Sequence, residues 1–209
     1  SELTTLDLSM TPLEVVPDLS KCESLSHLYL SYTNLQDLSF LKGLSALNYL
    51  TVTDTYIKDI SAIIEAPLLE TLDISSTFVS DISIVKEMHN LTSLYLAGTD
   101  VTNIDALAEH NSLEFLSLSG TNLSDFDVIA DIPGINSLDL SETKVSDLSF
   151  LKDRKELNHL DISNTLVTDL SPLFSVGELG SLTTYNCNIK KSELKKLKEK
   201  FPEMYCELD

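Results

Sequence analysis

The side chains that could do chemistry in this 209-residue chain are four histidines, three cysteines and 33 aspartates and glutamates. The cysteines, Cys22, Cys187 and Cys206, are odd in number and lack C-x-x-C spacing, so they indicate neither a zinc site nor a disulfide framework. The six glycines do not cluster into a phosphate-binding loop. Any chemistry must therefore come from histidines and carboxylates, and it depends on how the fold spaces them.

The carboxylates give the chain a formal net charge of −19, against only 14 lysines and arginines. A nucleic acid would meet repulsion where it needs cations, and an anionic membrane surface would do the same. No apolar run approaches the roughly 18 residues of a membrane span, and no signal peptide opens the chain. The composition therefore argues against nucleic-acid binding and membrane insertion.

A 22-residue repeat determines where these side chains lie. Its first position is occupied by Leu3, Leu25, Leu47, Leu69, Leu91, Leu113, Ile135, Leu157 and Leu179. The unit reads L-x-x-L-x-L-x-x-T-x-[LIV]-x-D-[LI]-S-x-[LIV] and ends in five looser residues. Self-similarity at a fixed period of this length is typical of solenoids. We assign residues 1–189 to nine repeats and residues 190–209 to a C-terminal helical cap with a last strand.

The first half of each unit has the pattern of a short strand. In L-x-L both leucines point to the same face, because strand side chains alternate. One coil cannot bury that face, but stacked coils bury it against each other. The ninth position is threonine in eight consecutive units, from Thr11 to Thr165. We expect each hydroxyl to bond a backbone group of its own or the next coil.

This unit resembles the leucine-rich repeat, L-x-x-L-x-L-x-x-N/C-x-L. Its second half is most similar to bacterial internalins and related regulators of protein phosphatase 1. One departure is systematic, since threonine replaces the family's asparagine. The resemblance implies an α/β right-handed solenoid with a concave parallel sheet of about nine to ten strands and short 3₁₀ or α turns on the convex side. It also implies protein recognition and a bacterial cell-surface or secreted location, with the cytoplasm as the alternative.

Seven equivalent polar residues stand just before the convex turn. They are Asp37, Asp59, Asp81, Asn103, Asp125, Asp147 and Asp169. Asp or Asn at the start of a helical turn accepts backbone N–H bonds as an N-cap. We interpret these residues as caps and not as metal ligands, and we predict no metal or other cofactor.

The C-terminal tail departs from the repeat. Leu194, Leu197 and Phe201 are spaced as one face of a helix, for which Ser192 is the expected N-cap. The stretch from residue 203 to 209 could add a tenth strand. Cys187 replaces the repeat's threonine, so we expect it to be buried. A bridge to Cys206 in the neighbouring coil is an alternative to two separate thiols.

The first repeat is atypical. Val15 stands where the capping Asp belongs, and Pro17 lies in the turn. The N-terminus supplies no cap of its own. We expect either that residues upstream of Ser1 are missing or that this end stacks on something.

Variable side chains on the concave side are the candidates for partner binding. The third, fifth, seventh and eighth positions of each unit should face solvent from the strand, with the tenth at the rim. The candidate residues are His27, Tyr29, Tyr32, Tyr49, Tyr56, Asp73, Phe78, Tyr95, Phe115, Asp139, Glu142, His159 and Asp161. Exposed rings on a rigid sheet are typical interface anchors. The alternative is that the rings only pair across neighbouring strands and stabilise the sheet.

Two of the carboxylates, Asp139 and Asp161, should lie on adjacent strands with backbones roughly 4.8 Å apart. A partner Lys or Arg, or a cation, would relieve their repulsion, and so would solvent and salt. Asp73 lies three coils away, about 14 Å by the same spacing. It cannot join the pair directly.

The distances between the candidate catalytic side chains argue against an enzyme. His27 and His159 are six coils apart, roughly 28 Å, and His89 and His110 belong to the loose outer segment. No histidine has both a nucleophile within a coil and a third orienting residue. The Asp139–Asp161 pair has a separation suited to glycoside hydrolysis, but it lies on an open face with nothing to exclude water. We predict no catalytic residues and no enzymatic activity.

The sequence therefore predicts a monomeric module that binds another protein, one with a basic patch, on its concave sheet. The first alternative is a glycan-binding surface, because glycans also favour exposed rings beside carboxylates. The second is an architectural spacer within a larger bacterial surface protein.

Overall fold

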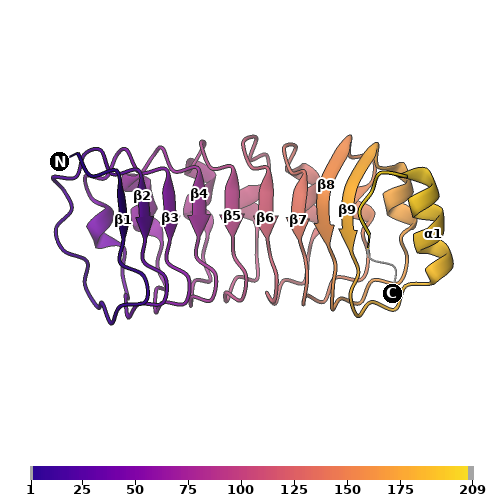
Figure 1. Ribbon diagram of the computed structural model, residues 1–209, viewed down its shortest axis with the longest axis horizontal. Helices are drawn as coiled ribbons and strands as arrows, with labels where there is room; N and C mark the ends of the chain where they lie inside the picture. Colours follow the sequence, from indigo (N-terminus) through magenta and orange to yellow (C-terminus); the bar gives the residue numbers. More distant parts are fainter. Residues whose placement is uncertain (1, 207–209) are drawn as a thin grey trace.

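The computed structural model describes residues 2–206, which form one nine-stranded sheet. The strands lie side by side in chain order and place the two ends of the chain at opposite ends of an elongated molecule (Figure 1). They are β1 Thr5–Asp7, β2 His27–Tyr29, β3 Tyr49–Thr51, β4 Thr71–Asp73, β5 Ser93–Tyr95, β6 Phe115–Ser117, β7 Ser137–Asp139, β8 Glu156–Asp161 and β9 Glu178–Thr183. All neighbours pair in parallel, so the predicted solenoid is confirmed. Each 22-residue repeat is one coil, and we number the coils one to nine.

The strands are in register by repeat position. Leu28 pairs with Leu50 and Leu50 with Leu72, so the fourth positions of successive coils stack. These three leucines are fully buried. The third and fifth positions point the other way, because strand side chains alternate. The repeat therefore directs one face of the sheet into the core and leaves the other open for a site.

The threonines of the ninth position are buried from coil two to coil eight, and each hydroxyl donates within its own coil. The Oγ1 of Thr33 donates to the carbonyl of Leu30 at 2.8 Å, and the same bond recurs in every coil from Thr11 to Thr165. In coil nine the Sγ of Cys187 instead contacts the carbonyl of Ile162, 2.8 Å away in coil eight. Cys187 is only half-buried, so its expected full burial is wrong.

Short 3₁₀ helices form the convex side of coils two to eight. They are η1 Ser39–Leu41, η2 Ser61–Glu65, η3 Ser83–Glu87, η4 Asp105–Leu107, η5 Asp127–Asp131, η6 Ser149–Leu151 and η7 Ser171–Ser175. All seven predicted capping residues accept the backbone N–H two residues on, at 2.7–2.9 Å. The bond is confirmed, but the position is wrong by one residue. The formal N-cap is the next residue, such as Leu38, so the capping carboxylate forms an Asx turn just before the helix.

These bonds stabilise the ionised carboxylates. Hydrogen bonds from Ser39 lower the pKa of Asp37, and bonds from Ser61 and Ser83 do the same for Asp59 and Asp81. The carboxylates of these turns therefore stay charged and occupied by their own backbone.

Coil one has no 3₁₀ helix, and the sequence explains why. The backbone N–H that a capping residue would bond belongs here to residue 17, a proline, which has none. A similar bond forms three residues after Val15, where Asp18 accepts the N–H of Ser20 at 2.9 Å. The convex side of coil one is consequently an irregular segment, and Val15 is 76% exposed.

The C-terminal tail packs on coil nine. Helix α1, Lys191–Lys200, buries Leu194 and Leu197. Its N-cap is Lys190 without a side-chain cap bond, so the expected cap at Ser192 is wrong. After the helix, Tyr205 forms a parallel bridge with Ser181. This bridge lies within the expected tenth strand, whose remaining residues, 207–209, lie outside the described part of the chain.

Two polar side chains, the buried His110 and the partly buried Arg154, occupy the twentieth repeat position, which is otherwise apolar in the interior coils. His110 lies outside the strands, on the outer segment as expected, but it is 7% exposed, a burial that the sequence analysis did not predict. Burial lowers its pKa. Arg154 donates from its two terminal nitrogens to the carbonyls of Ile129, Ile132 and Ile135, and so satisfies the backbone behind η5.

Among residues 2–206, no helix is long and apolar enough to cross a membrane. The three cysteines are thiols, so the Cys187–Cys206 bridge does not form in this structure.

Candidate functional site

Nine of the thirteen predicted site residues lie on the open face of the strands. The third position supplies His27, Tyr49, Phe115 and His159, and the fifth supplies Tyr29, Asp73, Tyr95, Asp139 and Asp161. Each of these side chains is only partly buried. The rigid sheet thus presents rings and carboxylates on one surface, as the repeat predicts.

The rings of the open face form two separate groups. Tyr49 stacks with His27 at 5.8 Å between ring centroids and contacts Tyr29 at 5.0 Å. The second group lies on β5 and β6, where the ring centroids of Tyr95 and Phe115 are 4.6 Å apart. Pairing across strands therefore does occur, as the alternative interpretation required. All five rings remain partly exposed, so part of their surface is still accessible to a partner.

A third ring pair lies at the rim, after the strands. Tyr56 and Phe78 stack with centroids 6.2 Å apart and an interplanar angle of 11°. Tyr56 is 54% exposed and Phe78 is 48% exposed. The Nζ of Lys58 lies 5.9 Å from the centroid of Phe78, so one edge of this pair is already in contact with a cation of the chain itself.

Asp139 and Asp161 lie opposite each other on β7 and β8, as the repeat predicts. The carboxylate of Asp139 is nevertheless occupied by the chain. Its Oδ2 accepts the hydroxyl of Ser117 at 2.9 Å, and its Oδ1 accepts both the N–H and the hydroxyl of Ser141 at 3.0 and 2.6 Å. The sequence analysis missed Ser117. The repeat does place Ser117 at the same position as Asp139, one coil earlier. Hydrogen bonds within the chain thus stabilise the Asp139 carboxylate, besides the partner Lys or Arg, the cation, or the solvent and salt that were considered for the pair.

Asp73 stands alone on β4, between the two ring groups. Its Oδ1 accepts the N–H of Ser75 at 3.0 Å. Burial raises the pKa of Tyr49 and of Tyr95, and the negative charge of Asp73 adds to the shift in both. Both phenols therefore remain protonated at neutral pH, and both sense the same carboxylate.

Tyr32 and Glu142 occupy the eighth position, which is a turn and not part of a strand. The assignment of the seventh and eighth positions to the strand is wrong, because β2 ends at Tyr29 and β7 at Asp139. Every coil has a left-handed residue at the eighth position, with φ of 59° at Tyr32 and 64° at Gly98. Its N–H reaches the next coil, as from Tyr32 to the carbonyl of Thr53 at 2.8 Å, which explains why the conformation recurs.

This turn makes the side chain at Tyr32 costly. A non-glycine residue in the left-handed region loses roughly 1–2 kcal/mol, and glycine does not. Gly98 and Gly120 show that the same turn forms with glycine in this chain. Tyr32 is 54% exposed, so core packing does not account for it. Six other coils also hold a non-glycine residue here, so the conformation at Tyr32 motivates a hypothesis of binding that needs its own test.

The histidines are dispersed as predicted. His27 on β2 and His159 on β8 are separated by five intervening strands, β3–β7. His159 shares a hydrogen bond of 2.8 Å between its Nδ1 and the Oγ of Ser181, a histidine–hydroxyl contact that the sequence reasoning had not foreseen. The same hydroxyl donates a hydrogen bond to the carbonyl of Asn158 at 3.2 Å. Within residues 2–206, no three His, Cys, Asp or Glu side chains come together as a metal site.

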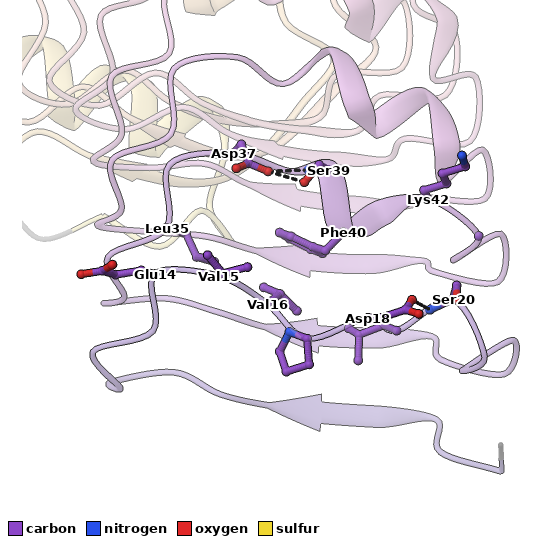
Figure 2. A pocket seen from close by; sticks show the side chains of 13 residues that line it. Glu14, Val15, Val16, Asp18, Ser20, Leu35, Asp37, Ser39, Phe40 and Lys42 are labelled. Carbon is purple, nitrogen blue, oxygen red and sulfur yellow. Dashed lines mark hydrogen bonds between the residues drawn. The ribbon is translucent and has the colours of Figure 1, made fainter.

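A cleft of about 580 Å³ opens where coil one lacks its convex helix (Figure 2). Val15, Val16 and Phe40 point into it, while Asp37 turns its carboxylate toward Ser39. The sequence had signalled this place only through the atypical Val15 and Pro17. The cleft lies beside η1 and contains none of the thirteen predicted residues.

Comparison with solved structures identifies the architecture. Over 98% of this chain, the fold matches an internalin (inlF) from Listeria monocytogenes with a TM-score of 0.86 and 24% identity. It matches internalin C2 of the same organism over 90% of this chain, with a TM-score of 0.78 and 26% identity, and covers 80% of that structure. A leucine-rich repeat protein from Leptospira interrogans matches over 97%, with a TM-score of 0.81 and 19% identity.

The chain spans 60% of the length of the inlF structure and 60% of the Leptospira structure. No protein-family model and no curated protein sequence matches it. Four observations indicate the same fold. They are the 22-residue repeat, the single parallel sheet, the short convex helices and these structural matches. The chain therefore folds as a leucine-rich repeat solenoid and is similar to the internalins.

Proposed function

We propose that this chain is a non-catalytic protein-recognition module that binds its partner on the open face of the sheet. The observation that carries the proposal is the pair of ring groups around Tyr49 and Tyr95, which remain partly exposed on rigid strands. Tyrosine and phenylalanine on a fixed backbone lose little conformational entropy on binding and are typical anchors. The rim rings Tyr56 and Phe78 would extend the contact beyond the strands.

The breadth of this surface favours a protein over a glycan. The ring groups extend from β2 to β6, four strand spacings of about 4.8 Å each, or roughly 19 Å. A protein interface of ordinary size covers such a breadth. The structural likeness to internalins supports the same general function. We further propose that the free chain is a monomer and that the partner presents basic side chains to this acidic surface.

The test removes one ring group and leaves the fold intact. The double variant Tyr95→Ala with Phe115→Ala truncates two partly exposed rings on β5 and β6. We expect affinity purification with the variant as bait to lose a partner that the wild-type chain retains. Circular dichroism and thermal unfolding should confirm that the solenoid remains folded.

A matched control carries Leu166→Ala with Tyr185→Ala. These side chains are 62% and 69% exposed in coils eight and nine, outside the proposed surface. The control should retain the partner. Equal recovery with both double variants would refute the proposed surface. A glycan array probed with the same three proteins examines the alternative, since ring-dependent signals there and none with proteins would favour a glycan ligand.

A further inference from the structure

The two ring groups enclose a strip of small side chains. Tyr49 on β3 and Tyr95 on β5 stand on either side of β4, two strand spacings or about 10 Å apart between backbones. The open-face positions between them hold Thr51, Thr71 and Ser93. None of these reaches as far from the sheet as a tyrosine ring does. The strip is therefore a stretch of small side chains with a tyrosine on each side.

Asp73 is the charged group of this strip. It lies opposite Thr51 on β3 and Tyr95 on β5. Within the described residues, its carboxylate accepts a single hydrogen bond, from the N–H of Ser75 to Oδ1, and no lysine or arginine pairs with it. Its Oδ2 retains its capacity to accept hydrogen bonds. A half-buried carboxylate with an unused oxygen between two tyrosines is complementary to a cation.

The repeat supplies an internal comparison. Asp139 has the same repeat position on β7, but both of its oxygens already accept hydrogen bonds from Ser117 and Ser141. Its neighbours on the adjacent strands are Ser117 and Asp161, and neither carries a ring. The carboxylate pair that looks most acidic in the sequence therefore lacks both features that distinguish Asp73.

We propose that Asp73, Tyr49 and Tyr95 form a receptor for an arginine side chain of the partner protein. The guanidinium would donate to the carboxylate of Asp73 and stack on the flanking rings. A planar guanidinium suits this geometry better than an ammonium, because it can stack and form directed hydrogen bonds at once. Both phenols are uncharged at neutral pH, so Asp73 is the only anion among the three. This inference rests on the proposed function and names the chemistry of its central contact.

The test uses a small arginine probe, so that it does not depend on finding the partner. N-acetyl-arginine N-methylamide is titrated into the full chain carrying ¹³C-labelled tyrosine, and ring shifts of Tyr49 and Tyr95 are followed by NMR. The matched neutral probe is the citrulline analogue, which has the same length and shape but no charge. We expect the arginine probe to shift both rings and to bind about tenfold more tightly than citrulline.

Two variants locate the carboxylate. Asp73→Asn keeps the acceptor for Ser75 and should weaken the arginine probe about tenfold, to the level of citrulline. Asp161→Asn changes a carboxylate at the same repeat position, which also accepts an N–H two residues on, and should leave binding unchanged. Their ¹⁵N spectra verify that both remain folded.

Three results would overturn the inference. They are equal shifts with arginine and citrulline, loss of binding in Asp161→Asn with retention in Asp73→Asn, and no ring shift with any probe. None of these touches the proposed function, which is read from partner loss in Tyr95→Ala with Phe115→Ala. A positive protein pull-down with a negative arginine titration would therefore reject the receptor alone.

Discussion

In coil nine the core leucine Leu182 is 1% exposed, whereas its equivalent in coil one, Leu6, is only partly buried. Beyond coil nine, the C-terminal tail adds the buried side chains Leu197, in α1, and Met204, after the helix, and the N–H of Leu182 donates to the carbonyl of Tyr205 at 2.9 Å. In coil one, Leu3 at the first repeat position is 38% exposed. The same sequence pattern is thus buried to different depths, because a coil is stabilised by its neighbours and hardly by itself.

The largest expected effect tests this difference at matched positions. Leu182→Ala should lower the free energy of unfolding by about 3 kcal/mol, because it empties a closed core site. Leu6→Ala should cost about 1 kcal/mol, because water already reaches part of that side chain. Urea denaturation followed by circular dichroism measures both values. Equal losses would show that the two ends are stabilised alike and would break the comparison.

The second difference between the ends is the missing convex helix of coil one. Val15→Asp combined with Pro17→Ser restores both the capping carboxylate and the N–H that it needs. We expect the double variant to gain about 1 kcal/mol in unfolding free energy, the usual value of a helix cap. Val15→Asp alone should gain nothing, because residue 17 would still lack an N–H. A similar gain from the single variant would disprove this explanation of the irregular segment.

The third prediction sharpens the contrast between end and interior coils through pH. His110 is buried in coil five, whereas the same position of coil one holds the half-buried Cys22. Burial lowers the pKa of His110 from its ordinary value of 6.5, so the unfolded chain takes up this proton first as pH falls. The contribution of His110 is fully present above pH 6.5 and is lost as pH falls from there toward the lowered pKa.

His110→Leu should therefore flatten the dependence of unfolding free energy on pH just below 6.5. Leucine stands at the same position in coil two as Leu44, so the site accepts it. His89→Gln, at an exposed histidine whose charge adds a smaller part to the lowering of the His110 pKa than burial does, should flatten the dependence less than His110→Leu. An unchanged slope in His110→Leu would show that another group titrates.

The repeat period and its apolar positions were enough to predict the sheet, its register and the outward side of each strand. The same pattern predicted that Asp37 and its equivalents bond the convex turn. Features that depend on backbone conformation were missed. The left-handed turn at the eighth position carries Tyr32, Asp54 and Glu142 as well as glycines, so no residue type marks it.

Contacts between coils were the other kind of feature that the sequence did not predict. Whether Asp139 is occupied depends on the reach of Ser117 from the preceding strand, and the burial of His110 depends on how a convex loop returns to the core. Neither follows from one repeat considered alone. The candidate site was therefore predicted as a set of positions, and its electrostatics required the packed structure.

The smallest effect on stability is expected at Tyr32, where an end coil and a proposed binding coil can be compared directly. Met10 in coil one has φ 58° and is 80% exposed, while Tyr32 in coil two has φ 59° and is 54% exposed. Replacing either residue with glycine relieves the left-handed conformation but adds chain entropy to the unfolded state. Both variants should therefore change the unfolding free energy by less than about 1 kcal/mol. Only Tyr32→Gly should weaken recovery of the partner in affinity purification. If Met10→Gly weakens it equally, or Tyr32→Gly leaves it unchanged, then the conformational cost at Tyr32 is not retained for binding, and the surface begins at the strands themselves.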